Sequence, residues 1–332
     1  MKCLFLLSGE NPEIASSEAQ MFVRDASLDG RLLIAECNRE ISELNGLAYT
    51  KKIYRLLFSC SKNKLKEMME NFGWNRVYKE SFSLRIFGMD KKKDHSEKEL
   101  ASIIWNSAKK PRVDLENAKT KIGIFISKKA YCCILIGEPK NNFDKRKPQF
   151  RPGFAPVSLS PKLARAMVNL SGAKKEAITD PFCGTGGILV EAGLTGNRAV
   201  GYDIDSRMLE KCRKNLEFYK IQNYRLTRKN ALEIKKRCRY IVTDLPYGQS
   251  SIMEGKNLYR DFIRNLKRIL GKRAVIGLPH GAEYKRIFSS EGLKVIKSFS
   301  YYIHKSLTKE IFVVEHAGKR AARGILEKNR HS

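Results

Sequence analysis

The sequence lacks the features that mark a membrane, disulfide-bonded or zinc-binding protein. Its longest apolar run near the start, Cys3 to Leu7, is far shorter than a signal-peptide core or a membrane span. None of the eight cysteines forms a CxxC pair, and no Cys/His cluster has the spacing of zinc ligands. We therefore expect free thiols in a reducing cytoplasm, no membrane partner and no bound metal.

Acidic residues are also scarce. The 332 residues include 35 Asp and Glu against 64 Lys and Arg, a formal net charge of +29. Hydrophobic residues make up 42%, enough for packed cores, which excludes a disordered polycation. The charge favours a polyanionic partner, with nucleic acid ahead of a membrane surface or an acidic protein. Charge alone leaves a generally basic, solvated surface as the alternative.

The charge is unevenly distributed along the chain. Residues 1–50 carry 4 basic and 8 acidic side chains, residues 51–150 carry 24 and 11, and residues 151–332 carry 36 and 16. A chain of this length is expected to form two or three domains. The acidic opening and basic remainder predict that only some of these domains contact the partner.

Four prolines between residues 138 and 160 separate two patterns of secondary structure. Before them, short strands and helices are mixed, as in an α+β region. After them, strands and helices alternate, and two final strands over 294–304 and 309–315 have no helix between them. Alternation of this kind predicts an α/β fold, a mostly parallel seven-stranded sheet covered by helices on both faces. The last two strands would form an antiparallel hairpin at its edge.

The first chemical motif is the run DPFCGTGG over residues 180–187, which follows a predicted strand and opens a helix. Glycines let the backbone approach a ligand closely, and a helix N-terminus favours negative charge. No Lys-Ser/Thr pair follows, so the run is not a P-loop, and it lacks the GxGxxG spacing. A tight strand–helix turn without a ligand is the alternative.

Two further motifs end the next strands. Asp203, about twenty residues later, is placed to accept hydrogen bonds from both hydroxyls of a ribose. Capping of the helix that begins at Ser206 is the alternative, although Asp205 is better placed for it. The run from Asp244 to Tyr247 can present acceptors to an exocyclic amine beside an aromatic ring, where stacking contributes roughly 1–3 kcal/mol per base. An ordinary Asp-containing turn is the alternative there.

Together these motifs resemble S-adenosylmethionine-dependent amino-methyltransferases with the (Asn/Asp)-Pro-Pro-(Tyr/Phe) signature. The segment from Ser158 to Leu170, the run DPFCGTGGILVEAG at 180–193 and TDLPYG at 243–248 resemble the archaeal tRNA guanosine-10 N2-methyltransferases. Val113 to Ala118 resembles the end of a THUMP domain, which binds RNA. The resemblance implies a ferredoxin-like α+β region over 1–55, a THUMP domain over 56–138, a basic Pro-rich linker over 139–160 and a Rossmann-fold methyltransferase domain over 161–332.

The resemblance also implies roles for individual residues. S-adenosylmethionine would be bound by Asp180, Cys183, Gly184, Gly186, Gly187, Asp203, Ile204, Asn230 and Ala231. Catalysis would involve Asp244, Leu245, Pro246 and Tyr247. Asp244 and the Leu245 carbonyl would accept hydrogen bonds from the guanine N2 amine, and Tyr247 would stack on the flipped base. Contacts with tRNA would come from Lys109, Lys110, Arg112, Lys119, Lys121, Arg146 and Lys147.

Two residues depart from the family pattern. Asn230 stands where the family usually has Asp, and Leu245 stands where it usually has the first of two prolines. Weaker cofactor binding and a less rigid turn are the expected results. The alternatives are methylation of adenine N6 or of ribosomal guanine, and a non-catalytic RNA-binding protein with a degenerate methyltransferase domain. A nicotinamide dehydrogenase would leave residues 244–248 unexplained. Some relatives use a small zinc-binding activator subunit; otherwise we expect a monomer.

Overall fold

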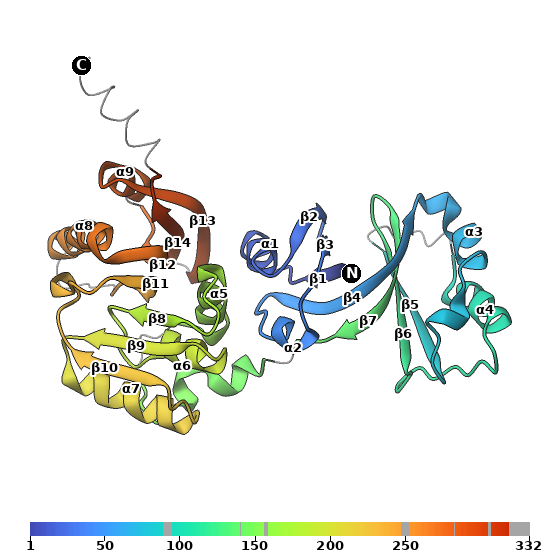
Figure 1. Ribbon diagram of the computed structural model, residues 1–332, viewed down its shortest axis with the longest axis horizontal. Helices are drawn as coiled ribbons and strands as arrows, with labels where there is room; N and C mark the ends of the chain where they lie inside the picture. The colour runs from blue at the N-terminus through green and yellow to red at the C-terminus, as the bar shows by residue number, and fades with distance from the viewer. Residues whose placement is uncertain are drawn as a thin grey trace, which may run out of the picture. The chain divides into compact units, whose positions relative to one another are not determined.

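The computed structural model divides the chain into two compact units, Met1–Asn141 and Asn142–Ser332. Each unit is built on one seven-stranded sheet (Figure 1). The residues that the structure describes are 1–88, 95–139, 141–155, 159–246, 252–281, 283–304 and 307–318.

The sheet of the first unit has the strand order β2-β3-β1-β4-β7-β6-β5. Its strands are β1 (Lys2–Leu7), β2 (Arg24–Asp29), β3 (Leu32–Glu36), β4 (Thr50–Cys60), β5 (Phe82–Gly88), β6 (Thr120–Ile126) and β7 (Ala130–Gly137). Its helices are α1 (Pro12–Gln20), α2 (Ile41–Leu44), α3 (Leu65–Glu70) and α4 (Glu97–Ser107), with 3₁₀ turns η1 (Lys62–Lys64) and η2 (Trp74–Arg76). The β6–β7 hairpin turns at residues 127–129. The sequence predicts a hairpin there, because two strand-like runs flank Lys128 and Lys129.

Strand β4 joins the two regions that the sequence predicts for this unit. Its first part pairs with β1 and its second part pairs with β7. Because one continuous strand carries both ladders, the boundary expected at residue 55 falls inside β4. The predicted ferredoxin-like and THUMP regions therefore share a single sheet.

Helices α3 and α4 cover the sheet beside β5 and β6 (Figure 1). Helix α4 begins after Ser96, whose hydroxyl accepts a hydrogen bond of 3.0 Å from the Glu99 N–H and so caps the helix. The side chains that close this core are Leu65, Met69, Trp74, Phe82, Leu100, Ile104 and Ile122. All are buried, which anchors both helices to this part of the sheet.

The second unit confirms the predicted α/β fold. Its sheet has the order β10-β9-β8-β11-β12-β14-β13, with the first five strands parallel and β14 and β13 antiparallel at the edge. The strands are β8 (Ala177–Asp180), β9 (Arg198–Asp203), β10 (Tyr224–Arg228), β11 (Cys238–Asp244), β12 (Leu270–Pro279), β13 (Leu293–His304) and β14 (Leu307–His316). The helices are α5 (Pro161–Ser171), α6 (Gly187–Leu194), α7 (Ser206–Phe218), α8 (Ile252–Ile269) and α9 (Tyr284–Ser290), with 3₁₀ turns η3 (Phe143–Arg146), η4 (Pro148–Phe150) and η5 (Ala231–Glu233).

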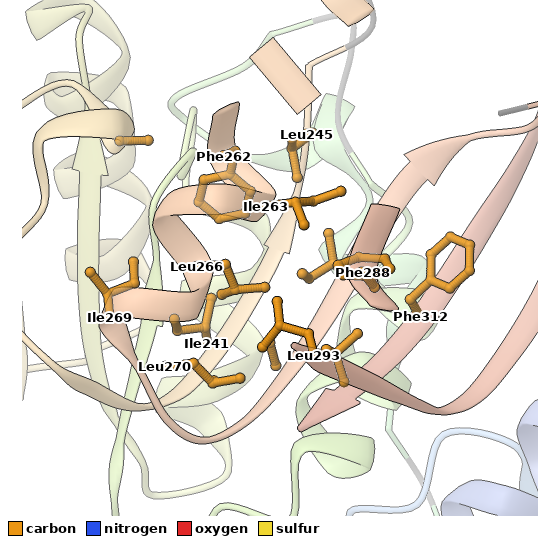
Figure 2. Packing of buried hydrophobic residues seen from close by; sticks show 14 of the residues in the cluster. Ile241, Leu245, Phe262, Ile263, Leu266, Ile269, Leu270, Phe288, Leu293 and Phe312 are labelled. Atoms are coloured by element: carbon orange, nitrogen blue, oxygen red, sulfur yellow. The ribbon is translucent and has the colours of Figure 1, made fainter. Parts of the chain in front are cut away.

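An apolar cluster packs α8 onto β11 and β12 (Figure 2). Burying one such side chain fully contributes roughly 1.5–3 kcal/mol. The fully buried members from α8 are Phe262, Ile263, Leu266 and Ile269, and they meet Ile241 of β11 and Leu270 of β12. Leu245, just after the end of β11, belongs to the same cluster, so the core reaches the carboxyl end of that strand.

The predicted linker is largely part of the second unit. Gly153 exchanges two hydrogen bonds with the Asn215 side chain on α7, of 2.8 and 3.0 Å. Arg146 makes a two-pronged ion pair with Glu191 on α6, at 2.7 and 3.1 Å, and Glu191 is completely buried. Arg165 pairs with the same carboxylate at 2.8 Å, so two guanidinium groups surround this buried charge. The phosphate contact expected of Arg146 stays a prediction.

Candidate active site

Four parallel strands of the second unit end at the same edge of the sheet. Strands β8, β9 and β11 each end in an aspartate: Asp180, Asp203 and Asp244. Asn230 follows shortly after β10. Open α/β sheets bind ligands at this edge, so the predicted cofactor and catalytic residues meet where the fold expects a site.

The glycines of the loop between β8 and α6 serve different purposes. Gly184 and Gly186 both have positive φ, +49° and +83°, which favours glycine. A Cβ on Gly186 would lie 2.5 Å from Cys212 Sγ, so this glycine permits close packing against α7. A Cβ on Gly184 would meet no atom within 4 Å. Gly184 is therefore the glycine of this pair that faces open space, where a ligand can lie against the backbone.

Asp203 carries the polar groups that suit a ribose. Its Oδ2 accepts a hydrogen bond of 2.9 Å from the Gly184 N–H, and its Oδ1 accepts one of 2.9 Å from the Asp205 N–H. Each carboxylate oxygen has two lone pairs, so each keeps acceptor capacity. The adjacent Ile204 is 66% exposed and offers an apolar surface beside the carboxylate. Two acceptors, a bare glycine and an apolar neighbour fit a nucleoside with two ribose hydroxyls.

Asn230 has a local role that the sequence does not reveal. Its Oδ1 accepts a hydrogen bond of 3.0 Å from the Leu232 N–H and caps the short turn η5. An adenine amine that approached this exposed residue would have to share Oδ1 with that cap. The neighbouring Ala231 is buried, and its carbonyl accepts from Asn265 Nδ2 at 3.0 Å.

Asp180 and Cys183 are buried at the base of the loop. Asp180 Oδ1 accepts hydrogen bonds from Thr243 Oγ1 at 2.7 Å and from the Phe182 N–H at 3.1 Å, which ties β8 to β11. Burial raises the pKa of Asp180 to about 7, against the opposing effect of these hydrogen bonds. A hydrogen bond with the Cys212 thiol and burial raise the pKa of Cys183, so its thiol stays neutral. Both side chains thus support the loop from beneath.

Asp244 lies at the end of β11 and forms an ion pair with Lys309 of β14 through Oδ2. Its Oδ1 is buried and has no hydrogen-bond partner among the described residues. Burial raises the pKa of Asp244, and the Lys309 ammonium acts in the opposite direction. The carboxylate therefore has unfilled acceptor capacity at the edge where the motif predicts an amine. Lys309 was not predicted, because it lies 65 residues from its partner in the chain.

Hydrogen bonds and packing hold the turn after Asp244, although Leu245 stands in place of the family's first proline. The Leu245 N–H donates a hydrogen bond of 3.1 Å to the Gly277 carbonyl, and the Leu245 side chain is completely buried. Tyr259 on α8 donates from its hydroxyl to the Pro246 carbonyl at 2.9 Å. These contacts anchor a turn that the sequence predicts to be less rigid. Tyr247, the predicted stacking residue, lies outside the described residues, so its role stays a prediction.

The predicted RNA-binding residues of the first unit lie between Lys109 and Lys121, in a segment whose start is held by hydrogen bonds to the Asn75 and Tyr78 side chains. Asn75 accepts from the Lys109 N–H at 2.9 Å and donates to the Ser107 carbonyl at 2.9 Å. The Tyr78 hydroxyl accepts from the Arg112 N–H at 3.1 Å. Most of the predicted side chains are exposed, namely Lys109, Lys110, Arg112 and Lys119, while Lys121 is half-buried. In the second unit Lys147 is also exposed and pairs with Asp144 at 2.7 Å.

Two other kinds of feature are absent from the part of the chain that the structure describes. Among those residues, no group of three or more His, Cys, Asp or Glu side chains is arranged to hold a metal ion. No helix there has both the length and the apolar character needed to cross a membrane.

Comparison with known proteins identifies the family. A family model described as an RMKL-like methyltransferase domain matches residues 148–309, and one described as a DNA methylase matches residues 36–214. The tRNA (guanine(10)-N2)-dimethyltransferase of Methanothermobacter thermautotrophicus is 34% identical, covering 95% of this chain and 99% of that protein. The enzyme of the same name from Pyrococcus abyssi is 32% identical, covering 92% and 96%.

A solved structure supports the fold. The crystal structure of TrmN from Thermus thermophilus superposes with a TM-score of 0.51 at 17% identity, covering 95% of this chain and all of that chain. The chain belongs to the family of tRNA (guanine(10)-N2)-dimethyltransferases, which are S-adenosylmethionine-dependent enzymes.

Proposed function

We propose that this protein methylates the exocyclic N2 amine of guanosine 10 in tRNA, up to the dimethylated product, in the cytoplasm. The observation that carries the proposal is the Asp244 carboxylate, which keeps an unpaired acceptor atom at the carboxyl end of β11. An exocyclic amine brings two N–H donors to such a group. The names of the full-length relatives supply the nucleotide and the RNA.

The substrate amine needs activation, because its lone pair is delocalised into the guanine ring. Asp244 and the Leu245 carbonyl would accept hydrogen bonds from its two protons and so favour a tetrahedral nitrogen with an exposed lone pair. The hydrogen bond from the Leu245 N–H to Gly277 fixes the peptide next to that carbonyl. Asp244 would then hold the proton that the nitrogen loses, a role helped by its raised pKa.

The cofactor residues fit S-adenosylmethionine. Asp203 would hold the ribose hydroxyls, the open face of Gly184 would lie beside the methionine portion, and Asn230 and Ala231 would meet the adenine. When bound, the cofactor supplies a methyl group on a positively charged sulfur. The protein's own contribution is to orient the amine and to exclude competing water.

The different roles of the loop glycines can be tested. Gly184→Ala should cost about 1 kcal/mol of stability through backbone strain, and should weaken S-adenosylmethionine binding by roughly tenfold or more, because a methyl group enters the open space. Gly186→Ala should cost about 2–4 kcal/mol, because its Cβ would also collide with Cys212. Urea unfolding and calorimetric titration measure both quantities.

Gly196→Ala is a matched control for strain alone. Gly196 has a φ of +77° and open surroundings in the turn between α6 and β9. It should show the small loss of stability with unchanged cofactor binding. If Gly184→Ala bound the cofactor as well as Gly196→Ala does, Gly184 would not line the cofactor site.

The proposed substrate is tested with unmodified tRNA transcripts and labelled cofactor. A transcript with inosine at position 10 keeps the ring but lacks the N2 amine, so labelling should fall to background. Mass spectrometry of the wild-type transcript should locate one and then two methyl groups on guanosine 10. Labelling that persists with inosine 10, or that maps to an adenine, would reject the proposed nucleotide.

Absence of transfer by the chain alone has two explanations that can be separated. A small zinc-binding activator subunit, as some relatives use, would restore transfer when added. If transfer remained absent and calorimetry detected no binding of S-adenosylmethionine, the protein would be a non-catalytic RNA-binding member of its family.

A further inference from the structure

Three neighbouring strands align an aspartate, a glycine and a lysine on one face of the second sheet. Asp244 of β11 is in register with Gly277 of β12, which is in register with Ile311 of β14. Lys309 lies two residues before Ile311 and therefore points to the same face. Its ammonium reaches back across β12 to Asp244 Oδ2.

Gly277 makes this arrangement possible. A Cβ at that position would lie 2.4 Å from Asp244 Oδ1, a distance that real Cβ contacts do not show. The carboxylate therefore rests directly on the backbone of β12, between its own strand and β14. Any larger residue at 277 would displace the carboxylate from Lys309.

Lys309 is an unusual residue for a strand interior. It is only 4% exposed, and a buried ammonium is costly unless an opposite charge compensates it. Asp244 supplies that charge through one oxygen, while the other oxygen has no partner among the described residues. The pair is thus satisfied at Oδ2, while Oδ1, which lies against Gly277, keeps acceptor capacity.

We propose that Lys309 is a positioning residue that holds the Asp244 carboxylate in place and ionised, ready to accept the protons of the substrate amine. The inference rests on the proposed function for the identity of that amine. Its structural part, the hold of Lys309 on Asp244, does not depend on the substrate.

The electrostatic surroundings of Asp244 support this role. Among the residues that the structure describes, the titratable groups that act on Asp244 or are acted on by it are Lys309 on β14, Asp180 on β8 and Tyr259 on α8. Burial raises the pKa of Asp244, and among these groups only Lys309 opposes that rise. Removing the ammonium should therefore raise the pKa further, and a protonated carboxyl group loses acceptor capacity for the amine.

Two variants of the full-length protein test the proposal. Lys309→Met keeps an unbranched side chain without the charge, and Lys309→Arg keeps the charge. For Lys309→Met we expect kcat on unmodified tRNA to fall by roughly 10–100-fold near neutral pH, with cofactor affinity little changed. The acidic limb of its kcat profile should move up by about one pH unit or more, because the lost cation no longer favours the carboxylate. Lys309→Arg should restore most of the activity and the original profile.

A measurement that requires no substrate tests the role of Lys309 independently of the proposed function. Carbon-detected NMR titration of the Asp244 carboxyl should give a higher pKa in Lys309→Met than in the wild type. If the wild type methylates another nucleotide, the proposed function fails while this titration still decides the role of Lys309. Gly277→Ala offers a second route to the same outcome, since it displaces the carboxylate while keeping the lysine.

Lys272→Met is the control for loss of a lysine from a strand. In the wild type, Lys272 lies on β12 and donates a hydrogen bond of 3.1 Å to the Tyr240 hydroxyl. It should leave the rate profile and the Asp244 titration unchanged. An unchanged Asp244 pKa and pH profile in Lys309→Met would overturn the proposal. So would an equal loss of activity in Lys309→Arg, which would indicate a packing role only.

Discussion

Asp244→Asn should lower the rate of methyl transfer by about 10³-fold while leaving the affinity for S-adenosylmethionine nearly unchanged. An amide has one acceptor oxygen, and Lys309, which binds Oδ2 in the wild type, would occupy it. The –NH₂ group would then stand where the carboxylate had its second acceptor. It can accept neither a hydrogen bond from the substrate amine nor its proton. Single-turnover assays with saturating tRNA measure the rate, and calorimetry measures the affinity.

Stability has to be followed in the same variant, because Asp244→Asn leaves the buried Lys309 charge without its counter-ion. Asp244→Ala should lose as much activity, since it also removes both acceptors. Asp205→Asn is the matched control, because asparagine caps helices about as well as aspartate and Asp205 lies at the start of α7. Turnover of either Asp244 variant near the wild-type rate would sink the catalytic assignment.

Asp203→Asn should weaken S-adenosylmethionine binding by about 100-fold. A hydrogen bond to a charged group contributes roughly 1.5–3 kcal/mol, and 1.4 kcal/mol corresponds to a factor of ten in affinity. Both carboxylate oxygens already accept backbone hydrogen bonds, from Gly184 and Asp205. The amide nitrogen of asparagine would face one of these N–H groups as a second donor, so the loop would shift as well.

Calorimetric titration with the cofactor measures this loss, and the product S-adenosylhomocysteine should lose affinity to a similar degree because it has the same ribose. Asp205→Asn again serves as the control and should bind both ligands normally. The reading of Asp203 as the ribose acceptor would be wrong if its asparagine variant bound adenosine ligands as tightly as that control.

The aspartates of the site could be predicted because each follows from the end of a parallel strand, whatever the place of that strand in the sheet. Asp180, Asp203 and Asp244 each end a strand of a parallel sheet, and parallel strands bring such residues to one edge. Lys309 and Gly277 could not be found in this way. Gly277 meets Asp244 through the parallel register of β11 and β12, and Lys309 reaches it through the antiparallel register of β12 and β14. Local sequence reveals neither register.

The first unit shows a second limit of sequence patterns. Strand β2, Arg24–Asp29, is missing from the predictions because most of its side chains are exposed, so it has no apolar alternation to recognise. For β4, the sequence pattern predicts a strand only over the last residues, from Leu56 to Cys60. A strand that passes from one ladder to another changes its neighbours along its length, so local composition does not mark its start.

The basic connector shows how charge can mislead when burial is unknown. Its prolines and cations predict an exposed linker that faces RNA. Arg146 instead pairs with Glu191, as Arg165 does, and Arg151 is buried and donates to the Arg146 carbonyl at 2.9 Å. Nothing in the local sequence indicates that Glu191, within an apolar helix, needs a cation from residues 146–151. Part of the net charge therefore stabilises the catalytic unit, and the remainder is available to phosphate.

The leucine at position 245 has an amide proton through which opening of the predicted catalytic turn can be measured. A proline at this position has no amide proton, whereas Leu245 has one and donates it to Gly277. The exchange rate of that single proton with deuterated solvent reports how often the turn opens. Comparing the rate with and without bound ligand would show whether the Leu245 carbonyl is held before the substrate binds or becomes ordered only in the complex.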